Sequence, residues 1–234
     1  GRVGESVYQL YIANKNYSSW SLRPWILLHA LDLVFEERFV PFLLPDNYDA
    51  FRTFSPNGKV PCLVDGEQVV WDSLAIVEYL YEQDSRVWPE ALAARTWARC
   101  ASAEMHSGFS ALREVCTMNV GVTVRLNDVS AALQRDIDRL DELWCDGLQR
   151  FGGPFLAGSN FTAVDAFFAP VVFRARTYEL LLSDAANAYV ARILQLPAML
   201  AWEADALLEP YREEAHEAEL HEIGKILLDR RQPL

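Results

Sequence analysis

Asn16-Tyr17-Ser18-Ser19-Trp20-Ser21-Leu22-Arg23-Pro24 stands between a β-type run over residues 7–13 and an apolar helical run over residues 25–33. This order predicts a tight turn from a strand into a helix. Because proline is tolerated in the first turn of a helix, Pro24 indicates a helix start between Ser19 and Leu22. The unpaired N–H groups at such a start stabilise anions, and Ser18 and Ser19 lie beside them. Serine is also a preferred helix cap, so the turn alone does not distinguish a binding site from a cap.

The composition allows a large core and argues against several kinds of partner. The chain has 234 residues, 51% of them hydrophobic, which suits one large domain or two modest ones. Lys and Arg number 21 against 33 Asp and Glu, a net charge of -12 that repels nucleic acid and anionic membranes. No apolar run approaches the roughly 20 residues that span a bilayer, and residues 1–6 carry no signal-peptide pattern. We therefore expect a cytoplasmic protein with no nucleic-acid partner and no membrane partner.

The cysteines and two of the histidines indicate neither a disulfide framework nor a metal site. The sequence contains no Cys-x-x-Cys pair and no histidine at ligand spacing from a cysteine. We expect no metal and four buried or half-buried free thiols, at Cys62, Cys100, Cys116 and Cys145. His216 and His221 lie five positions apart in an acidic, helical segment over residues 209–222, so they do not share one helix face. We interpret both as solvated surface residues.

The first part of the chain alternates strands and helices. The opening helix is expected to run to about Asp32, followed by a strand over Phe35 to Phe42 and a short irregular helix within Pro45 to Phe54. Two apolar runs then flank Asp65-Gly66, which is a strong hairpin signal. The sequence therefore predicts a βαβ-α-ββ order in which the last two strands form a hairpin.

Two positions around this hairpin are consistent with either folding or binding. Proline in a strand is expected at an edge, at a strand start or after a cis bond. If the bond before Pro61 is cis, the backbone of Val60 is free to pair with a peptide-like ligand; a strand-start proline with no ligand is the alternative. Asp72 and Ser73 begin the next helix, where they serve either as a cap or as partners for a ligand with both a carboxylate and an ammonium group.

The second part of the chain is predicted to be helical. Asp84 to Pro89 is a polar linker closed by proline, after which we expect no further strands, so the boundary separates residues 1–83 from residues 90–234. Helical patterns cover residues 90–118, 127–151, 162–182 and shorter pieces up to 208. Thr162 and Asp165 have the spacing of a capping box, and we assign them to folding.

Four motifs at consistent spacing resemble those of the glutathione S-transferases. They are the serine turn at 18–23, which is most similar to the zeta class and related bacterial members, a loop before a cis-proline at 55–61, an acid-Ser signature at 72–80 and a folding motif at 161–165. The resemblance covers about residues 7–208. It implies a thioredoxin-like α/β N-terminal domain that binds glutathione, an all-α C-terminal domain that shapes an apolar substrate pocket, and a homodimer.

The resemblance also implies roles for the matching residues. Ser18 would hydrogen-bond the glutathione sulfur, with Ser19 as the close alternative. A free thiol has a pKa near 8.5, so a hydroxyl donor and a helix N-terminus would favour the nucleophilic thiolate. The backbone of Val60 would bind the cysteinyl part, Asp72 and Ser73 would hold the γ-glutamyl end, and Lys59 would reach a carboxylate. Glutathione would thus be the co-substrate.

The turn departs from the family pattern at one position. Trp20 stands where zeta-type sequences carry a cysteine, so we do not carry over maleylacetoacetate isomerase activity. The absence of a cysteine from the turn also argues against the transferases that use one for thiol–disulfide exchange. Tyr11 and Tyr17 keep a tyrosine-type site open, although we interpret Tyr11 as a core strand residue and Tyr17 as a wall of the pocket.

The second-substrate pocket is the least specified part of the site. Its candidates are Tyr17, Trp20, His106 and Arg113. His106 is either an acid–base group or a residue that packs between helices, and Arg113 is either a pocket residue or a surface residue. Arg174 and Arg176 would attract an acidic substrate, but exposed arginines on an acidic protein need no such role.

The sequence therefore predicts a detoxifying glutathione transferase. In it, a Ser18-stabilised thiolate attacks an electrophilic carbon of a hydrophobic small molecule. The same site would support glutathione-dependent isomerisation or dehalogenation. A non-catalytic member that keeps the fold as a binding or interaction module is the alternative from another class, since a fold does not determine a function.

Overall fold

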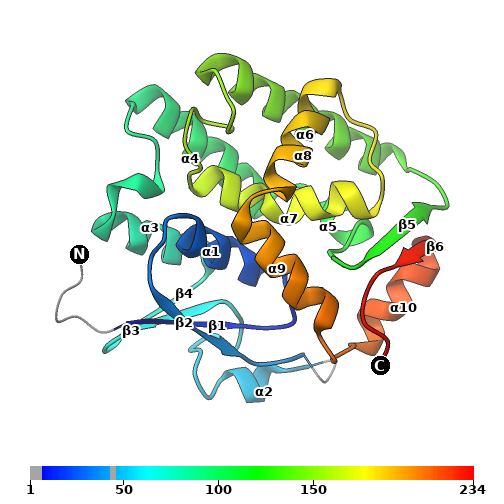
Figure 1. Cartoon of the computed structure of the whole chain (residues 1–234), viewed down its shortest axis with the longest axis horizontal. Coiled ribbons are helices and arrows are strands. Elements are labelled where there is room, and N and C mark those ends of the chain that lie inside the picture. The colour runs from blue at the N-terminus through cyan, green and yellow to red at the C-terminus, as the bar shows by residue number, and fades with distance from the viewer. Residues whose placement is uncertain (1–6, 43–45) are drawn as a thin grey trace.

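The computed structural model describes residues 7–42 and 46–234. Its first part is built on a four-stranded mixed sheet of order β2-β1-β3-β4, with β1 parallel to β2 and antiparallel to β3. Helices α1 and α3 lie on one side of this sheet and the short α2 on the other (Figure 1). The elements are β1 (Tyr8–Ile12), α1 (Ser19–Ala30), β2 (Phe35–Phe39), α2 (Tyr48–Phe51), β3 (Cys62–Asp65), β4 (Gln68–Trp71) and α3 (Ser73–Gln83).

The predicted order of the first part is confirmed, with small changes at the element boundaries. Helix α1 begins at Ser19, within the predicted interval, so Pro24 lies in the second turn of the helix and not in the first. The bond between Val60 and Pro61 is cis, and β3 begins directly after it. The short helix expected within Pro45 to Phe54 is α2, although Pro45 itself lies outside the described residues.

The second part is mainly helical. It follows a short 3-10 turn, η1 (Ser85–Val87). Helix α7 is buried along almost its whole length and packs against both α1 and α4, so the two parts of the chain share one hydrophobic core. The helices are α4 (Leu92–Ser107), α5 (Ser110–Val115), α6 (Ala131–Phe151), α7 (Ala163–Thr177), α8 (Asp184–Leu194), α9 (Pro197–Leu208) and α10 (Glu214–Ile223).

Two predictions for the second part are wrong in detail. The helix expected over residues 90–118 is divided, because Phe109 adopts a left-handed conformation with φ 55° between α4 and α5. Strands also do not stop at the linker: β5 (Val122–Leu126) pairs antiparallel with β6 (Gly224–Asp229). The alternating valines of β5 favour a strand, but a run of five residues is too short for its periodicity to be distinctive.

The folding motif of the helical part has the structural role predicted for it. Asp165 is fully buried at the start of α7. Its carboxylate accepts hydrogen bonds from the N–H groups of Thr162 and Leu156, both at 3.0 Å, and from the hydroxyl of Tyr189 at 2.7 Å. These bonds join the loop before α7 to the helix and to α8. The carboxylate of Asp165 therefore has its hydrogen-bond partners inside the core.

The four cysteines are all free thiols. Cys62 and Cys116 are buried and Cys145 is half-buried, as expected, but Cys100 is exposed. Burial raises the pKa of Cys116 to about 12, so this thiol stays protonated at neutral pH. Among the described residues, none of the helices combines the length and the apolar character that a membrane crossing requires.

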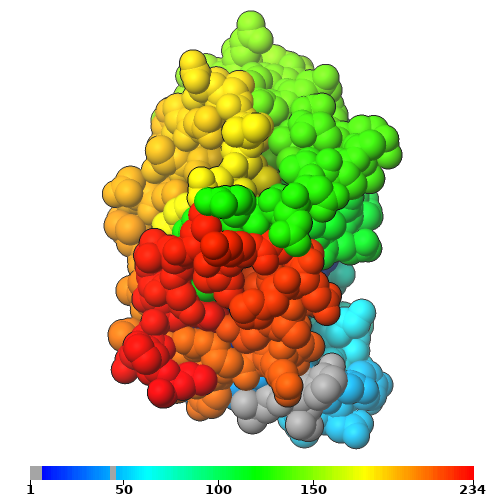
Figure 2. Space-filling model, turned by 90° about the vertical axis from the view of Figure 1, so that its right-hand side faces the viewer, coloured from blue at the N-terminus to red at the C-terminus, as the bar shows by residue number. Residues whose placement is uncertain are grey.

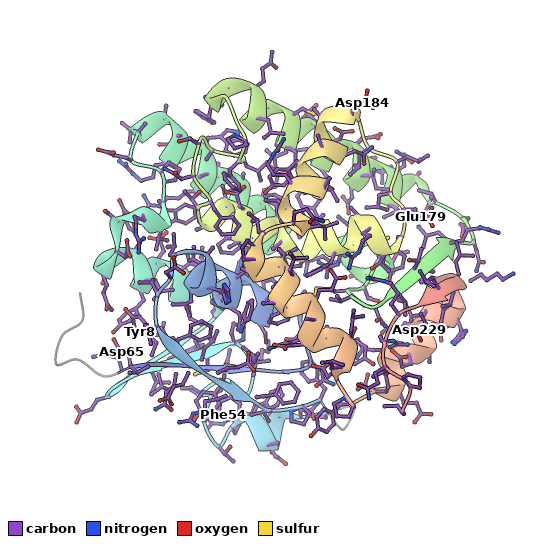
Figure 3. The ribbon with its side chains drawn as sticks, viewed as in Figure 1. Tyr8, Phe54, Asp65, Glu179, Asp184 and Asp229 are labelled. Atoms are coloured by element: carbon purple, nitrogen blue, oxygen red, sulfur yellow. The ribbon has the colours of Figure 1, made fainter. Side chains whose placement is uncertain are left out.

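The C-terminal segment, which we define as residues 213–231 with α10 and β6, folds back onto the rest of the molecule. Figure 2 shows it, in orange-red and red, on the face between the lower α/β part and the upper helical part. Arg231 ties the segment together by donating to Glu217 and Asp229, at 2.8 and 2.9 Å. Asp229 is labelled in Figure 3 beside α10.

Candidate functional site

A cavity of about 560 Å³ opens where the turn before α1 meets the helical part and the C-terminal segment. Its walls come from several regions that are far apart in the sequence, from the turn at residues 17–20 to His216 in α10. They include most of the candidates identified from the sequence, namely Tyr17, Ser18, Ser19, Trp20, Lys59, Val60 and Arg113. The other lining residues are Phe42, Asp46, Asn47, Tyr48, Phe51, Gly58, Glu114, Thr117, Met118, Arg174 and His216.

The serine turn does not serve merely as a helix cap. Ser18 occupies the N-cap position of α1, but its side chain accepts no capping hydrogen bond. Its hydroxyl lies 2.6 Å from that of Ser21, which accepts the N–H of Ala13 at 3.3 Å. Ser21 thus joins the helix to the residue that follows β1.

The loop before the cis-proline forms another part of the wall. Gly58 has a φ of 69°, and a β-carbon there would meet the Tyr48 ring at 2.3 Å, so this close packing requires glycine. The turn places Lys59 and Val60 at the cavity, immediately before the cis bond. Val60 precedes the strand ladder, in which the pairing of β3 with β1 begins at Cys62.

Asp72 and Ser73 do not line this cavity. Asp72 caps α3 by accepting the N–H of Leu74 at 2.9 Å, and it does so with a positive φ of 73°, which is unusual for a residue other than glycine. The hydroxyl of Ser73 is buried without a hydrogen-bond partner in the described part of the chain. Asp72 therefore has a structural role as a helix cap, whereas the hydroxyl of Ser73 has no partner among the described residues.

His106 is also absent from the wall of this cavity. Its ring meets the Trp20 ring edge-on, with centroids 5.2 Å apart, and its Nε2 lies 3.5 Å from Asp72 Oδ1. Trp20 therefore contacts both the cavity and the ring of His106, which lies beside Asp72. Burial lowers the pKa of His106, despite the nearby Asp72 carboxylate, so its imidazole is mainly neutral at neutral pH.

Neither tyrosine is available to a bound thiol. The ring of Tyr11 stacks on Phe54 at 4.2 Å, and Figure 3 places Phe54 beside α2, below the sheet. Tyr17 lines the cavity, but its hydroxyl donates to Glu217 at 2.8 Å and accepts the N–H of Glu213 at 3.3 Å. Burial and the Glu217 charge raise the pKa of Tyr17, so the hydroxyl keeps its proton.

The sequence interpretation named Arg113 as a pocket candidate but missed Arg23, and both lie on the Trp20 ring. The guanidinium of Arg23 lies 4.0 Å from the Trp20 ring centroid, and that of Arg113 lies 5.8 Å from it. Arg23 is 0% exposed, and none of its three guanidinium nitrogens has a hydrogen-bond partner in the regions that the structure describes. Burial is the main cause that lowers the pKa of Arg23, and the positive charges of Arg174 and Arg113 lower it further.

Arg174 lies in the wall of the cavity and is buried, whereas the sequence interpretation treated it as exposed. Its Nε donates to the carbonyl of Cys116 at 2.8 Å, while its Nη1 has no partner within residues 7–42 and 46–234. Arg176 differs, because it pairs with Glu203 at 2.9 Å. Burial lowers the pKa of Arg174 to about 10, which leaves it charged at neutral pH.

His216 also lines the cavity, although the sequence interpretation did not place it there. It was interpreted as a solvated residue of the acidic segment, but its ring stacks on that of Tyr17 with centroids 4.7 Å apart. His221, on the same helix, is exposed as expected. No local signal in the sequence distinguishes the two histidines, because the contact joins residues about 200 positions apart, as does the neighbouring bond from Tyr17 to Glu217.

Comparisons with known proteins agree with this architecture. Residues 17–83 match the family model described as the glutathione S-transferase N-terminal domain, and residues 123–204 match that of the C-terminal domain. The chain is 30% identical over 173 residues to a glutathione S-transferase-like protein of Beauveria bassiana, covering 69% of this chain and 76% of that protein. It is 30% identical to a zeta-class glutathione S-transferase of Euphorbia esula, with 68% and 73% covered.

A further relative and two solved structures extend the comparison. A probable maleylacetoacetate isomerase of Caenorhabditis elegans is 28% identical, with 84% of this chain and 92% of that protein covered. A Burkholderia glutathione transferase homologue with bound glutathione superposes with a TM-score of 0.64 at 21% identity, covering 86% and 98% of the two chains. A theta-class enzyme of Xanthomonas axonopodis with glutathione bound gives a TM-score of 0.62 at 23% identity, with 84% and 96% covered. The chain belongs to the glutathione S-transferase family of glutathione-dependent enzymes.

Proposed function

We propose that this protein is a cytoplasmic glutathione transferase in which Ser18 stabilises the thiolate and the second substrate is an apolar electrophile that carries an acidic group. One observation carries the proposal. A single cavity contains the Ser18 hydroxyl and two arginine side chains, Arg113 and Arg174, and beside it lies the unpaired Arg23. Isomerisation, which the name of the worm relative suggests, is not favoured, because Trp20 occupies the position of the zeta-class cysteine.

The hydroxyl pair of the turn supports Ser18 as the donor to sulfur. Ser21 accepts the N–H of Ala13, so its own proton is available to Ser18. The Ser18 proton is then free to point into the cavity, toward the N-terminal end of α1 where an anion is stabilised. A chain of hydrogen bonds polarises each member, which strengthens the donation to a thiolate.

From the sulfur position at Ser18, the rest of glutathione would extend toward Lys59 and Val60 and toward Asp72 and Ser73. Val60 and Lys59 offer a backbone group and a cation along the cavity wall. Ser73 fits the γ-glutamyl end, because a buried hydroxyl without a partner is costly unless a ligand satisfies it, and Asp72 beside it suits an ammonium group. The proposal thus assigns the binding of glutathione to residues 1–83, with residues 84–89 as linker and 90–234 as the part that completes the second-substrate pocket.

The arginines support an acidic second substrate. Burying an unpaired charge costs several kcal/mol, so a buried guanidinium without a counter-charge is expected where a ligand supplies the anion. Arg113 is the most accessible of the three and lies on the Trp20 ring at the cavity. The apolar side chains of Phe42, Phe51 and Met118 leave room for the hydrophobic body of such a molecule.

The test compares two electrophiles that differ in charge and by one methyl group, a carboxylic acid and its methyl ester. We expect kcat/KM to favour the acid by about tenfold, the equivalent of roughly 1.4 kcal/mol, and Arg113→Gln to abolish this preference. Arg176→Gln is the matched control, because Arg176 lies on α7 with Arg174 but pairs with Glu203. Equal rates for acid and ester in the native protein would contradict the acidic substrate, and no glutathione consumption with either would contradict the transferase.

A homodimer and a detoxifying role complete the proposal, and family membership supports both. Light scattering after size-exclusion chromatography should give twice the mass of the chain. A protein that stays monomeric across the concentrations used for activity would contradict the homodimer.

A further inference from the structure

His216 is the one histidine in the described cavity wall, and it reaches the cavity from the C-terminal segment. Its ring stacks on Tyr17 at 4.7 Å and lies parallel to Phe42 with centroids 6.1 Å apart. The ring is therefore held between two aromatic side chains whose residues also line the cavity. This position lies beyond the ranges matched by the family models, which end at residue 204.

Glu213 sets the orientation of this ring. Glu213 Oε2 lies 2.5 Å from His216 Nδ1, and the side chain of Glu213 is only 6% exposed. The same oxygen accepts the backbone N–H of His216 at 2.8 Å. A carboxylate that accepts Nδ1–H selects the tautomer in which Nε2 carries the free lone pair, and it stabilises the imidazolium after Nε2 takes up a proton.

The segment that carries this pair is firmly attached to the site. Glu217, one turn after Glu213, accepts hydrogen bonds from the hydroxyl of Tyr17, from Asn119 and from Arg231, at 2.8, 3.2 and 2.8 Å. Since Tyr17 directly precedes Ser18 in the turn, these bonds hold α10 against the part of the cavity where the sulfur would lie.

Building on the proposed function, we propose that His216, oriented by Glu213, is the group that accepts the thiol proton of glutathione. The S–H bond breaks, its electron pair stays on sulfur, and the proton passes to His216 Nε2, which leaves a thiolate and an imidazolium. The thiolate then forms a bond to the electrophilic carbon. In an addition, the resulting carbanion takes the proton back from Nε2; in a substitution, the leaving group departs with its electron pair and the proton is lost to solvent.

The charged and titratable groups around His216 are compatible with this role. Glu213 is the carboxylate in contact with His216, and Glu217, the next residue in the chain, pairs with Arg231. Tyr17 is no competing acceptor, because burial and Glu217 raise its pKa and it stays protonated. Hydrogen bonds from His216 lower the pKa of Glu213 in spite of its burial, so this carboxylate is charged at neutral pH. The other such groups lining the cavity are Asp46, Tyr48, Lys59, Arg113, Glu114 and Arg174.

The decisive experiment counts protons. Glutathione is mixed with the protein in weakly buffered solution near neutral pH. Ultraviolet absorbance measures the thiolate formed, and a pH indicator measures the protons released. We expect fewer than one proton per thiolate in the native protein, because His216 keeps the proton, and one proton per thiolate in His216→Gln. His221→Gln, a change at the exposed histidine of the same helix, should behave like the native protein.

The other outcomes contradict either the inference about His216 or the proposed function. A ratio of one in the native protein would overturn the inference, and so would a ratio below one that survives His216→Gln. A protein that binds no glutathione and forms no thiolate would instead contradict the proposed function. Circular dichroism of each variant establishes that it is folded.

A second readout separates chemistry from packing. His216→Gln should lower kcat by about a hundredfold for an electrophile that undergoes addition, since a carbon must be protonated, and clearly less for one that loses a halide. Glu213→Gln should also lower kcat more for the addition than for the reaction that loses a halide, but by smaller factors than His216→Gln. An equal loss for both electrophiles would indicate a merely structural role for the pair.

Discussion

Replacing Ser18 by alanine tests the centre of the proposed site. Ser18 is 5% exposed and its hydroxyl makes no capping bond to α1, so removal of the hydroxyl leaves no helix N–H group without a cap. What is lost within the protein is one hydrogen bond to Ser21, worth about 1 kcal/mol. We therefore expect Ser18→Ala to fold, with a free energy of unfolding lowered by about that amount.

The effect on the thiol should be larger. A hydrogen bond to a charged group in a buried site contributes about 1.5–3 kcal/mol, and one pKa unit corresponds to about 1.4 kcal/mol. The pKa of bound glutathione should therefore rise by roughly one to two units. It should stay below that of free glutathione, because the N-terminus of α1 still stabilises the thiolate.

Titration of the thiolate absorbance with saturating glutathione measures this pKa directly. Ser19→Ala, at the neighbouring cavity residue, is the matched control and should leave the pKa unchanged. A pKa unaltered in Ser18→Ala but raised in Ser19→Ala would transfer the role to Ser19. If neither variant changes it, the serine mechanism is refuted.

Three further predictions concern charges near the site. Arg23→Met should raise the free energy of unfolding by about 1–4 kcal/mol in urea titrations, because it removes a buried, unpaired charge; a decrease would show that Arg23 has a structural partner. Asp72→Asn, which can still cap α3, should keep stability while weakening glutathione affinity about fivefold by calorimetry, and unchanged affinity would leave Asp72 only its capping role. Although burial opposes it, Arg231 lowers the pKa of Glu217, so this pair's stabilisation should be present above about pH 4.5 and lost as the pH falls through the lowered value. Glu217→Gln should flatten that acid limb of the urea-unfolding profile, and an unaltered limb would contradict the assignment.

Short-range chemistry explains what the sequence predicted. The serine turn, the cis bond before Pro61 and the structural role of Asp165 each depend on residues a few positions apart, where proline, glycine and hydroxyl side chains leave a local signature. These motifs were sufficient for the fold and for the part of the cavity wall that the serine turn and the loop before Pro61 supply. They also located the turn at which an anion would be stabilised.

Long-range burial explains what the sequence did not predict. An arginine on a helix reads as a surface residue, and only the packing of Trp20 and Phe167 against Arg23 makes it a buried charge. The pairing of β5 with β6 and the placing of His216 on Tyr17 likewise join residues about 100 and 200 positions apart. Trp20 itself was expected in the pocket, but its edge-on contact with His106 joins residues of two distant helices and has no local signal in the sequence.

The return of α10 to the opening turn has a consequence for the order of assembly during translation. The bond from Tyr17 to Glu217 closes a loop of 200 positions, among the most non-local contacts in the described chain. A ribosome-bound chain that has emerged only as far as α9 can already form the sheet and much of the core, yet its pocket still lacks the wall that His216 supplies. Completion of the pocket should therefore lag behind the appearance of the fold, because closing so long a loop is entropically costly and comes late.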